Sequence, residues 1–388
     1  MNRWFVLGVF VLSTAINYLD RQTLATLAPL VRAEYHLSNA EYGLILTAFS
    51  LTYMTAAPFA GMLIDRLGLN RAISAAVAVW SVAGIATGLT RGLGGLVGCR
   101  AVLGAAEAAG IPAAGKAIHA YLKPAERALG NAVNQAGVSL GLMLAPPVAT
   151  WLALRYGWRH AFVLTGVLGL VWIPLWLRVA RQSPAVGGRA AVSLELLRSR
   201  RMWGLVAANG LGMVIYSLWT NWTTLYLVEV TRLTLVQAAW YAWIPPLAAT
   251  VGGFAGGWLS LRWMQGGLEA VAARTRVCLV GAVVALATAA IPLAPSAALA
   301  SAGISLSIFA VAAFSVNMYT MPLDTFGGER AAFAVSILVS SYGAVQALAS
   351  PAIGAAIDAW GYTPVCGMTA LTPLAAYGVL RWTESDPS

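Results

Sequence analysis

The feature that most constrains this chain is a succession of long apolar runs separated by short stretches that carry the charges. Of its 388 residues, 59% are hydrophobic and 10% are charged, whereas about a quarter of the residues of a typical soluble domain are charged. The mean hydropathy is +0.74. One or two aqueous cores cannot bury so much apolar surface, which excludes a soluble enzyme. The sequence predicts an all-α polytopic membrane protein.

Runs of about 20 apolar residues cross a bilayer as helices. The first run is too long for a signal peptide and has no small-residue cleavage site, so we interpret it as a span. With both termini in the cytoplasm, most of the 24 Lys and Arg residues lie on the cytoplasmic side, as the positive-inside rule requires. The net charge of +10 then follows from topology, and no nucleic-acid partner is expected. The twelve predicted spans lie near 4–30, 41–63, 73–91, 94–118, 127–153, 160–178, 203–228, 236–260, 275–294, 298–320, 331–357 and 362–381.

A polar, strongly basic segment at residues 179–202 separates two sets of six spans. We therefore expect six-helix halves at residues 1–178 and 203–388, joined by a cytoplasmic linker that could also contact anionic lipid. The cysteines Cys99, Cys278 and Cys366 lie far apart in apolar runs without metal-ligand spacing. No disulfide, metal or cofactor is expected.

The two halves contain repeated features. Ser38-x-x-Glu41 and Thr234-x-x-Gln237 are both capping boxes, each placed at the start of a predicted span. A second pair of similar segments begins at Ala145 and Ala349, and each continues through a proline to a glycine followed by an aromatic residue. Repeated halves are typical of secondary transporters, whose substrate site lies near the bilayer midplane.

The segment Gly61-Met-Leu-Ile-Asp65-Arg66-Leu-Gly68-Leu-Asn-Arg71 has every fixed position of the pattern G-x-x-x-D-R/K-x-G-x-x-R/K. In this it resembles the major facilitator superfamily, a family of two six-helix halves. The resemblance implies that this loop is a gate that latches the halves together. The alternative is a turn that only sets topology. The second copy carries Leu261 at the aspartate position.

Three further elements look like the anion:cation symporter family of that superfamily, which includes hexuronate, galactonate and sialin-type transporters. They are Asn17-Tyr-Leu-Asp20-Arg21, the pair Arg100 and Glu107, and a Pro-Pro pair followed by Gly-Trp-Arg at residues 157–159. The resemblance implies that Asp20 and Glu107 couple protons, that Arg21 binds the substrate and that Arg100 assists coupling.

These four charges are unusual because a charge inside a membrane is costly and usually functional. Glu107 follows Arg100 by two helical turns, so both lie on one helix face about 10 Å apart. Asp20 and Arg21 are adjacent and point about 100° apart, so we assign Arg21 to the substrate and Asp20 to a partner such as Arg100.

Two arginines in a cavity of low dielectric favour binding of a carboxylate. A buried carboxylate is pushed towards protonation by desolvation and away from it by a nearby arginine, which suits a proton carrier. The alternative is that the four charges form two structural ion pairs, Asp20 with Arg100 and Arg21 with Glu107.

Other candidate substrate contacts are polar groups within predicted spans. Tyr53 matches a substrate contact in sugar-acid members of this family, and Asn134 and Gln135 lie within one or two residues of another. The second half contributes polar rather than charged groups. These candidates are Tyr53, Asn134, Gln135, Asn317 and Ser340.

The sequence therefore predicts a proton-coupled symporter that imports an organic anion, such as a hexuronate or aldonate, across the bacterial inner membrane as a monomer. One alternative is an exchanger of organic anions or organophosphates that is not driven by protons. A membrane enzyme or a sensor is disfavoured, because the sequence has no metal cluster, no Gly-x-Ser-x-Gly elbow and no soluble signalling domain.

Overall fold

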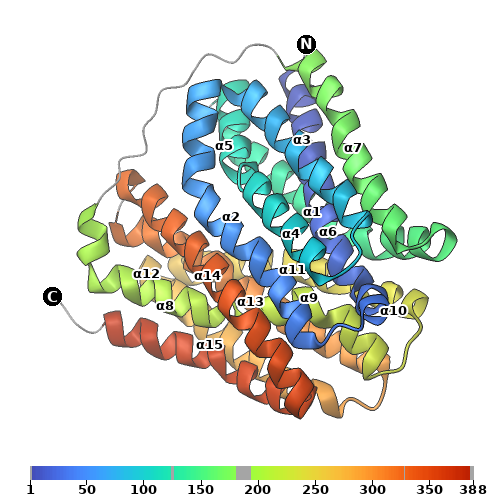
Figure 1. Cartoon of the computed structure of the whole chain (residues 1–388). Helices are drawn as coiled ribbons and strands as arrows, with labels where there is room; N and C mark the ends of the chain where they lie inside the picture. Colours follow the sequence, from blue (N-terminus) through green and yellow to red (C-terminus); the bar gives the residue numbers. More distant parts are fainter. Residues whose placement is uncertain (1, 124–125, 181–193, 327, 385–388) are drawn as a thin grey trace. The chain divides into compact units, whose positions relative to one another are not determined.

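A computed structural model describes residues 2–123, 126–180, 194–326 and 328–384 (Figure 1). Within these ranges the regular structure is entirely helical, as predicted. Most of the predicted linker at 179–202 lies outside the described residues. Its last part contains a short 3-10 helix, η2 (Leu194–Arg198).

Each predicted span coincides with one helix or with two consecutive helices. Breaks of one or two residues divide the fourth, seventh and eighth spans, and a change to 3-10 geometry divides the ninth. The helices are α1 (Arg3–Tyr35), α2 (Asn39–Leu67), α3 (Leu69–Gly88), α4 (Leu93–Glu107), α5 (Gly110–Tyr121), α6 (Arg127–Tyr156), α7 (Trp158–Val179), α8 (Arg200–Gly212), α9 (Val214–Glu229), α10 (Leu235–Ala242), α11 (Ile244–Gln265), α12 (Ala270–Ala285), η3 (Leu286–Leu293), α13 (Ala297–Phe326), α14 (Gly328–Trp360) and α15 (Tyr362–Glu384).

Within the described residues, nine helical stretches are long and apolar enough to cross a membrane by length and composition alone. The helix α1 is not among them, and its polar residues Asn17, Asp20 and Arg21 lower its mean hydropathy. Large apolar side chains on other helices point outwards, and Phe254 and Leu348 are 74% and 76% exposed. Such exposure is unfavourable in water and is expected of a surface that faces lipid.

The chain divides into two compact units, one formed by residues 1–188 with Thr234–Trp243 and the other by residues 189–233 with 244–388. In the first unit the main helix pairs are α1 with α6, α2 with α4 and α3 with α7, and α10 also packs on α6. In the second unit, α8 packs on α14, α11 on α13 and α12 on α15. Helices in corresponding positions of the two repeats therefore pair in the same way.

The repeated sequence features have matching local structure. Ser38 and Thr234 are N-caps with complete capping boxes, at the starts of α2 and α10. Gly157 and Gly361 separate α6 from α7 and α14 from α15, with φ of +89° and +75°. Since a side chain disfavours such a φ, glycine at both positions is explained by the same tight turn.

The predicted gating loop is a one-residue connection. Gly61 lies within α2, which ends at Leu67, and Gly68 alone joins it to α3, with φ +79° and ψ 156°. Arg66 and Arg71 are exposed on either side of this turn. The side chain of Asp65 lies outside the described residues, so its gating role stays a prediction.

A polar cluster, here called the Glu34 cluster, joins the end of α1 to the start of α7. Arg159 forms an ion pair of 2.7 Å with Glu34, and the indole of Trp158 donates to the same carboxylate. Arg159 also donates to the hydroxyl of Tyr35 at 3.0 Å, and that hydroxyl donates to the carbonyl of Thr90. The Gly-Trp-Arg element thus fastens α7 to α1.

Candidate functional site

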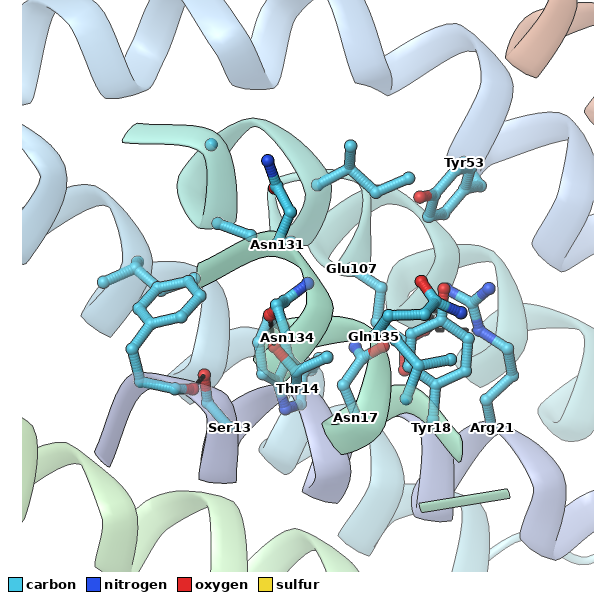
Figure 2. A pocket seen from close by; sticks show the side chains of 18 residues that line it. Ser13, Thr14, Asn17, Tyr18, Arg21, Tyr53, Glu107, Asn131, Asn134 and Gln135 are labelled. Atoms are coloured by element: carbon cyan, nitrogen blue, oxygen red, sulfur yellow. Dashed lines mark hydrogen bonds and ion pairs between the residues drawn. The ribbon is translucent and has the colours of Figure 1, made fainter. Parts of the chain in front are cut away.

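The first unit contains a cavity of about 320 Å³ between α1, α2, α3, α4, α5 and α6 (Figure 2). Hydroxyl, amide, aromatic and ionised side chains lie around it. Its lining residues are Phe10, Ser13, Thr14, Asn17, Tyr18, Arg21, Tyr53, Ile73, Trp80, Glu107, Gly110, Ile111, Ala114, Gly115, Asn131, Asn134, Gln135 and Val138.

One face of α1 supplies a third of this lining. Phe10, Ser13, Asn17 and Arg21 recur every three or four residues, which places them on the same side of a helix. Figure 2 shows this row beside the amides of α6. Because Gly141 has no side chain, α6 can approach the backbone of α1 closely. The crossing of α1 and α6 therefore fixes the position of the row.

Glu107 is placed by a break in the fourth span. It is the last residue of α4, and α5 begins at Gly110 after a two-residue turn. Pro112 lies in the first turn of α5, where its missing backbone N–H disrupts no helical hydrogen bond. The break therefore lies in the wall of the cavity, where Glu107 and Gly110 both line it.

Arg21 and Glu107 face each other across the cavity wall. The guanidinium donates from Nε at 3.1 Å and from Nη2 at 2.8 Å to one carboxylate oxygen of Glu107. Its centre also lies 4.9, 4.7 and 5.1 Å from the ring centroids of Tyr18, Phe49 and Tyr53. The side chain of Glu107 is fully buried, whereas that of Arg21 is 27% exposed. The arginine is therefore the member of the pair that a ligand in the cavity can reach.

Asp20 turns away from this cavity into the packing of α1 against α3 and α7. Thr165 on α7 donates to its Oδ1 at 2.8 Å, and a side chain at Gly84 on α3 would lie 3.2 Å from its Oδ2. Arg100 is 3% exposed, interacts electrostatically with Asp20 and lies 5.9 Å from the ring of Phe162. Neither charge is among the residues that line the cavity.

The four predicted charges interact electrostatically with one another, and two of them form an ion pair at the cavity. Arg21 and Glu107 are paired at the cavity, and Asp20 lies near Arg100 behind it. The pair of Arg21 with Glu107 is one of the two pairs that the structural alternative requires, but the 27% side-chain exposure of Arg21 leaves it open to a ligand. The substrate role predicted for Arg100 and the coupling role predicted for Asp20 stay predictions.

The remaining predicted contacts fall in two places. Tyr53, Asn134 and Gln135 line the cavity of the first unit. In the second unit, the amide of Asn317 donates to backbone carbonyls of α11 and α13 at 3.2 and 2.9 Å, so it serves helix packing there. Ser340 donates to a carbonyl one turn earlier on α14.

Sequence reasoning did not assign a site role to several lining residues. Thr14 and Asn17 on α1, and Asn131 on α6, line the cavity beside the predicted contacts. The helical period could have found them, because Asn17 and Thr14 lie one and two turns from Arg21 on the same face.

Comparisons with known proteins agree with this fold. Residues 10–311 match the model of the Major Facilitator Superfamily. A hexuronate transporter of Escherichia coli K12 is 29% identical, over 98% of this chain and 93% of its own length. A probable sulfoacetate transporter of Cupriavidus necator is also 29% identical, over 90% of this chain and 86% of its own length.

A solved structure has the same architecture. It is a bacterial homologue of the human lysosomal transporter Spinster, in an inward-facing and occupied conformation, with a TM-score of 0.79 and 21% sequence identity. The alignment covers 98% of this chain and 95% of that one. The predicted fold and the predicted resemblance are confirmed. The chain belongs to the major facilitator superfamily, and it is a multi-pass membrane transporter rather than an enzyme.

Proposed function

We propose that this protein is a proton-coupled symporter that imports a sugar acid, such as a hexuronate or an aldonate, across the inner membrane of a bacterium. Both termini are cytoplasmic, and the protein works as a monomer by alternating access of its two halves. The observation that carries this proposal is the partly exposed guanidinium of Arg21, paired with the buried carboxylate of Glu107 at a polar cavity.

Arg21 is suited to hold the carboxylate of the substrate. Its guanidinium is permanently charged and binds a carboxylate through two parallel hydrogen bonds, each worth about 1.5–3 kcal/mol. Three aromatic rings pack around it and fix its orientation. Among the described residues that line the cavity, it is the only cation, which favours a monocarboxylate over a phosphate dianion.

Coupling follows from competition for this one arginine. In the structure Glu107 occupies two donors of Arg21. A substrate carboxylate that takes these donors leaves Glu107 buried without its ion-pair partner, and desolvation then pushes the buried carboxylate towards protonation. Substrate binding and proton binding then favour each other, which is the requirement for symport.

The polar character of the cavity favours a sugar acid. The named substrates of the two relatives, hexuronate and sulfoacetate, share an anionic group but differ in hydroxyl content. Amides from Asn17, Asn131, Asn134 and Gln135 line this cavity, and such groups recognise hydroxyls. A site built to hydrogen-bond hydroxyls discriminates against ligands that lack them.

The alternative is an organic-anion exchanger that is not driven by protons. It needs an anion site but no coupling carboxylate, and Glu107 would then remain paired with Arg21 as a structural partner. Organophosphate exchange would in addition need a second cation at the cavity, and Arg100 does not line it.

The test is uptake of labelled D-glucuronate, D-galactonate, sulfoacetate and glycerol phosphate into proteoliposomes, with and without an inward proton gradient. We expect gradient-driven accumulation of a sugar acid. Arg21→Lys should raise KM by about tenfold or more, because lysine keeps the charge but cannot form the two parallel hydrogen bonds of a guanidinium. Arg155→Lys is the matched control at an exposed arginine. Uptake that ignores the gradient and requires an internal anion would refute symport.

A further inference from the structure

Asn17 lies on the face of α1 that lines the cavity, between Arg21 at one end and Thr14 towards the other. Arg21 is one helical turn beyond it, and Thr14 is nearly one turn before it (Figure 2). Four residues of helix advance about 6 Å. A six-carbon acid whose carboxylate contacts Arg21 therefore reaches Asn17 with one of its hydroxyls, whereas a two-carbon acid is too short.

The amide of Asn17 has a hydrogen-bonding group without a protein partner. The residue is 6% exposed, and its Nδ2 has no partner among the described residues. Asn209 and Asn317 are also buried, and each donates from Nδ2 to two acceptors, although the Oδ1 of each has no partner among the described residues. Burying an unpaired amide is unfavourable, so its presence beside a cavity needs an explanation.

A ligand supplies that explanation. Rotation of the amide about its last torsion exchanges its donor and acceptor, so the side chain can offer either to a hydroxyl in the cavity. The close approach of α1 to Gly141 on α6 restricts movement of the backbone that carries Asn17. Asn17 is thus a pre-positioned polar group whose Nδ2 has no partner in the part of the chain that the structure describes.

A second amide lies farther along the same row. Asn134 on α6 accepts a hydrogen bond of 2.9 Å from Thr14 through Oδ1. This bond fixes the orientation of the amide, which leaves its Nδ2 as the donor for other partners. Arg21, Asn17 and Asn134 then form a line in the order carboxylate, middle and far end.

We propose that Asn17 is a specificity-determining residue that binds a mid-chain hydroxyl of the sugar acid held by Arg21, with Asn134 serving the distal hydroxyls. This inference rests on the proposed function and narrows it to polyhydroxylated acids of about six carbons. Short anions and deoxygenated acids bind weakly because they leave the amide of Asn17 unpaired.

The test uses Asn17→Leu, which keeps the approximate shape of the side chain and removes its polar atoms. KM is measured in proteoliposomes for D-glucuronate, D-galacturonate and D-galactonate, and inhibition constants are measured for their monodeoxy analogues. Wild type should bind one monodeoxy analogue about tenfold more weakly than its parent. Asn17→Leu should bind the parent acid and that analogue with the same affinity. In a double-mutant cycle, removing the hydroxyl from the ligand costs nothing further once the amide that contacts it has been removed from the protein.

Controls separate this role from folding. Asn209→Leu removes a hydrogen-bonded asparagine of the second unit and should change the affinity for every acid by the same factor. Asn17→Ser is the second variant if the leucine variant does not fold. Because the Nδ2 of Asn17 has no partner to lose, both Asn17 variants should melt no lower than wild type.

The outcomes distinguish the two proposals. If Asn17→Leu weakens parents and all analogues by one common factor, or none, the specificity role is overturned while sugar-acid transport stands. If wild type transports none of these acids, the proposed function fails and the inference fails with it.

Discussion

Replacing Gly141 by alanine should separate α1 from α6 and weaken substrate binding. A Cβ at Gly141 would lie 2.3 Å from the carbonyl oxygen of Ala15 and 3.0 Å from the amide nitrogen of Leu19. Ordinary contacts are about 3.5 Å, so the helices must move apart by about 1 Å. Overpacking of this kind costs about 1–3 kcal/mol. The gain in helix propensity from glycine to alanine is at most about 1 kcal/mol, so the net effect is destabilising.

The displacement also moves the binding residues, because Asn17 and Arg21 lie on α1. A misplacement of about 1 Å can cost up to a hundredfold in rate. We expect Gly141→Ala to lower the melting temperature in detergent and to raise KM for the transported acid by about tenfold. Thermal unfolding of the purified protein and uptake into proteoliposomes measure the two effects.

Two further glycines provide a graded series. A side chain at Gly137 would meet the Cγ1 of Val11 at 2.5 Å and its backbone oxygen at 3.1 Å, a milder backbone contact than at Gly141. A side chain at Gly8 would meet nothing within 4 Å. The loss of melting temperature and the rise in KM on substitution by alanine should therefore be smaller at Gly137 than at Gly141 and absent at Gly8. If Gly141→Ala melts and transports like Gly8→Ala, the close crossing of α1 and α6 does not position the site.

Three other predictions concern the frame around the site. Gly68→Ala should destabilise the protein by about 1–3 kcal/mol, because φ +79° with ψ 156° is almost restricted to glycine; thermal unfolding should show no such loss for Gly61→Ala, where a side chain has open space. Thr165→Val should cost about 1–3 kcal/mol in the same assay, since it removes the hydrogen bond to the buried Asp20. The hydrogen bond from the indole of Trp158, and then the guanidinium of Arg159, lower the pKa of Glu34 below its usual value of 4.5. The stability that Glu34 contributes should therefore be present at neutral pH and disappear as the pH falls through its lowered pKa, so the melting temperatures of wild type and Glu34→Gln should converge in acid; a constant difference would contradict this.

Most of the fold could be predicted from the sequence, because a helix that crosses a bilayer needs a long run of apolar residues that is easy to recognise. Runs of apolar residues identify each crossing, and the repeated capping boxes at Ser38 and Thr234 identify two equivalent helix starts. Pro112 and Pro245 indicate the breaks after Glu107 and at Trp243, whereas no proline lies beside the break at Met213, which could not be placed. These breaks do not interrupt the hydrophobic character of their spans.

The candidate site was only partly predictable. The charges at Arg21 and Glu107 stand out because ions are rare in apolar spans. Periodicity along one helix does not decide whether Asp20 or Arg21 faces a cavity, since that depends on which neighbouring helices pack on each side. The helical period places Asn17 and Thr14 on the same face as Arg21, but only the approach of α6 shows that this face lines a cavity.

Symport through this site requires that substrate displaces Glu107 from Arg21 and that Glu107 then takes a proton. The most direct test is to add D-glucuronate to the purified protein in weakly buffered detergent solution and to follow pH with an indicator dye. We expect saturable proton uptake from solution when the wild-type protein binds D-glucuronate. This uptake should disappear in Glu107→Gln, while binding itself persists. Binding without proton uptake in wild type, or the same uptake in Glu107→Gln, would contradict this expectation.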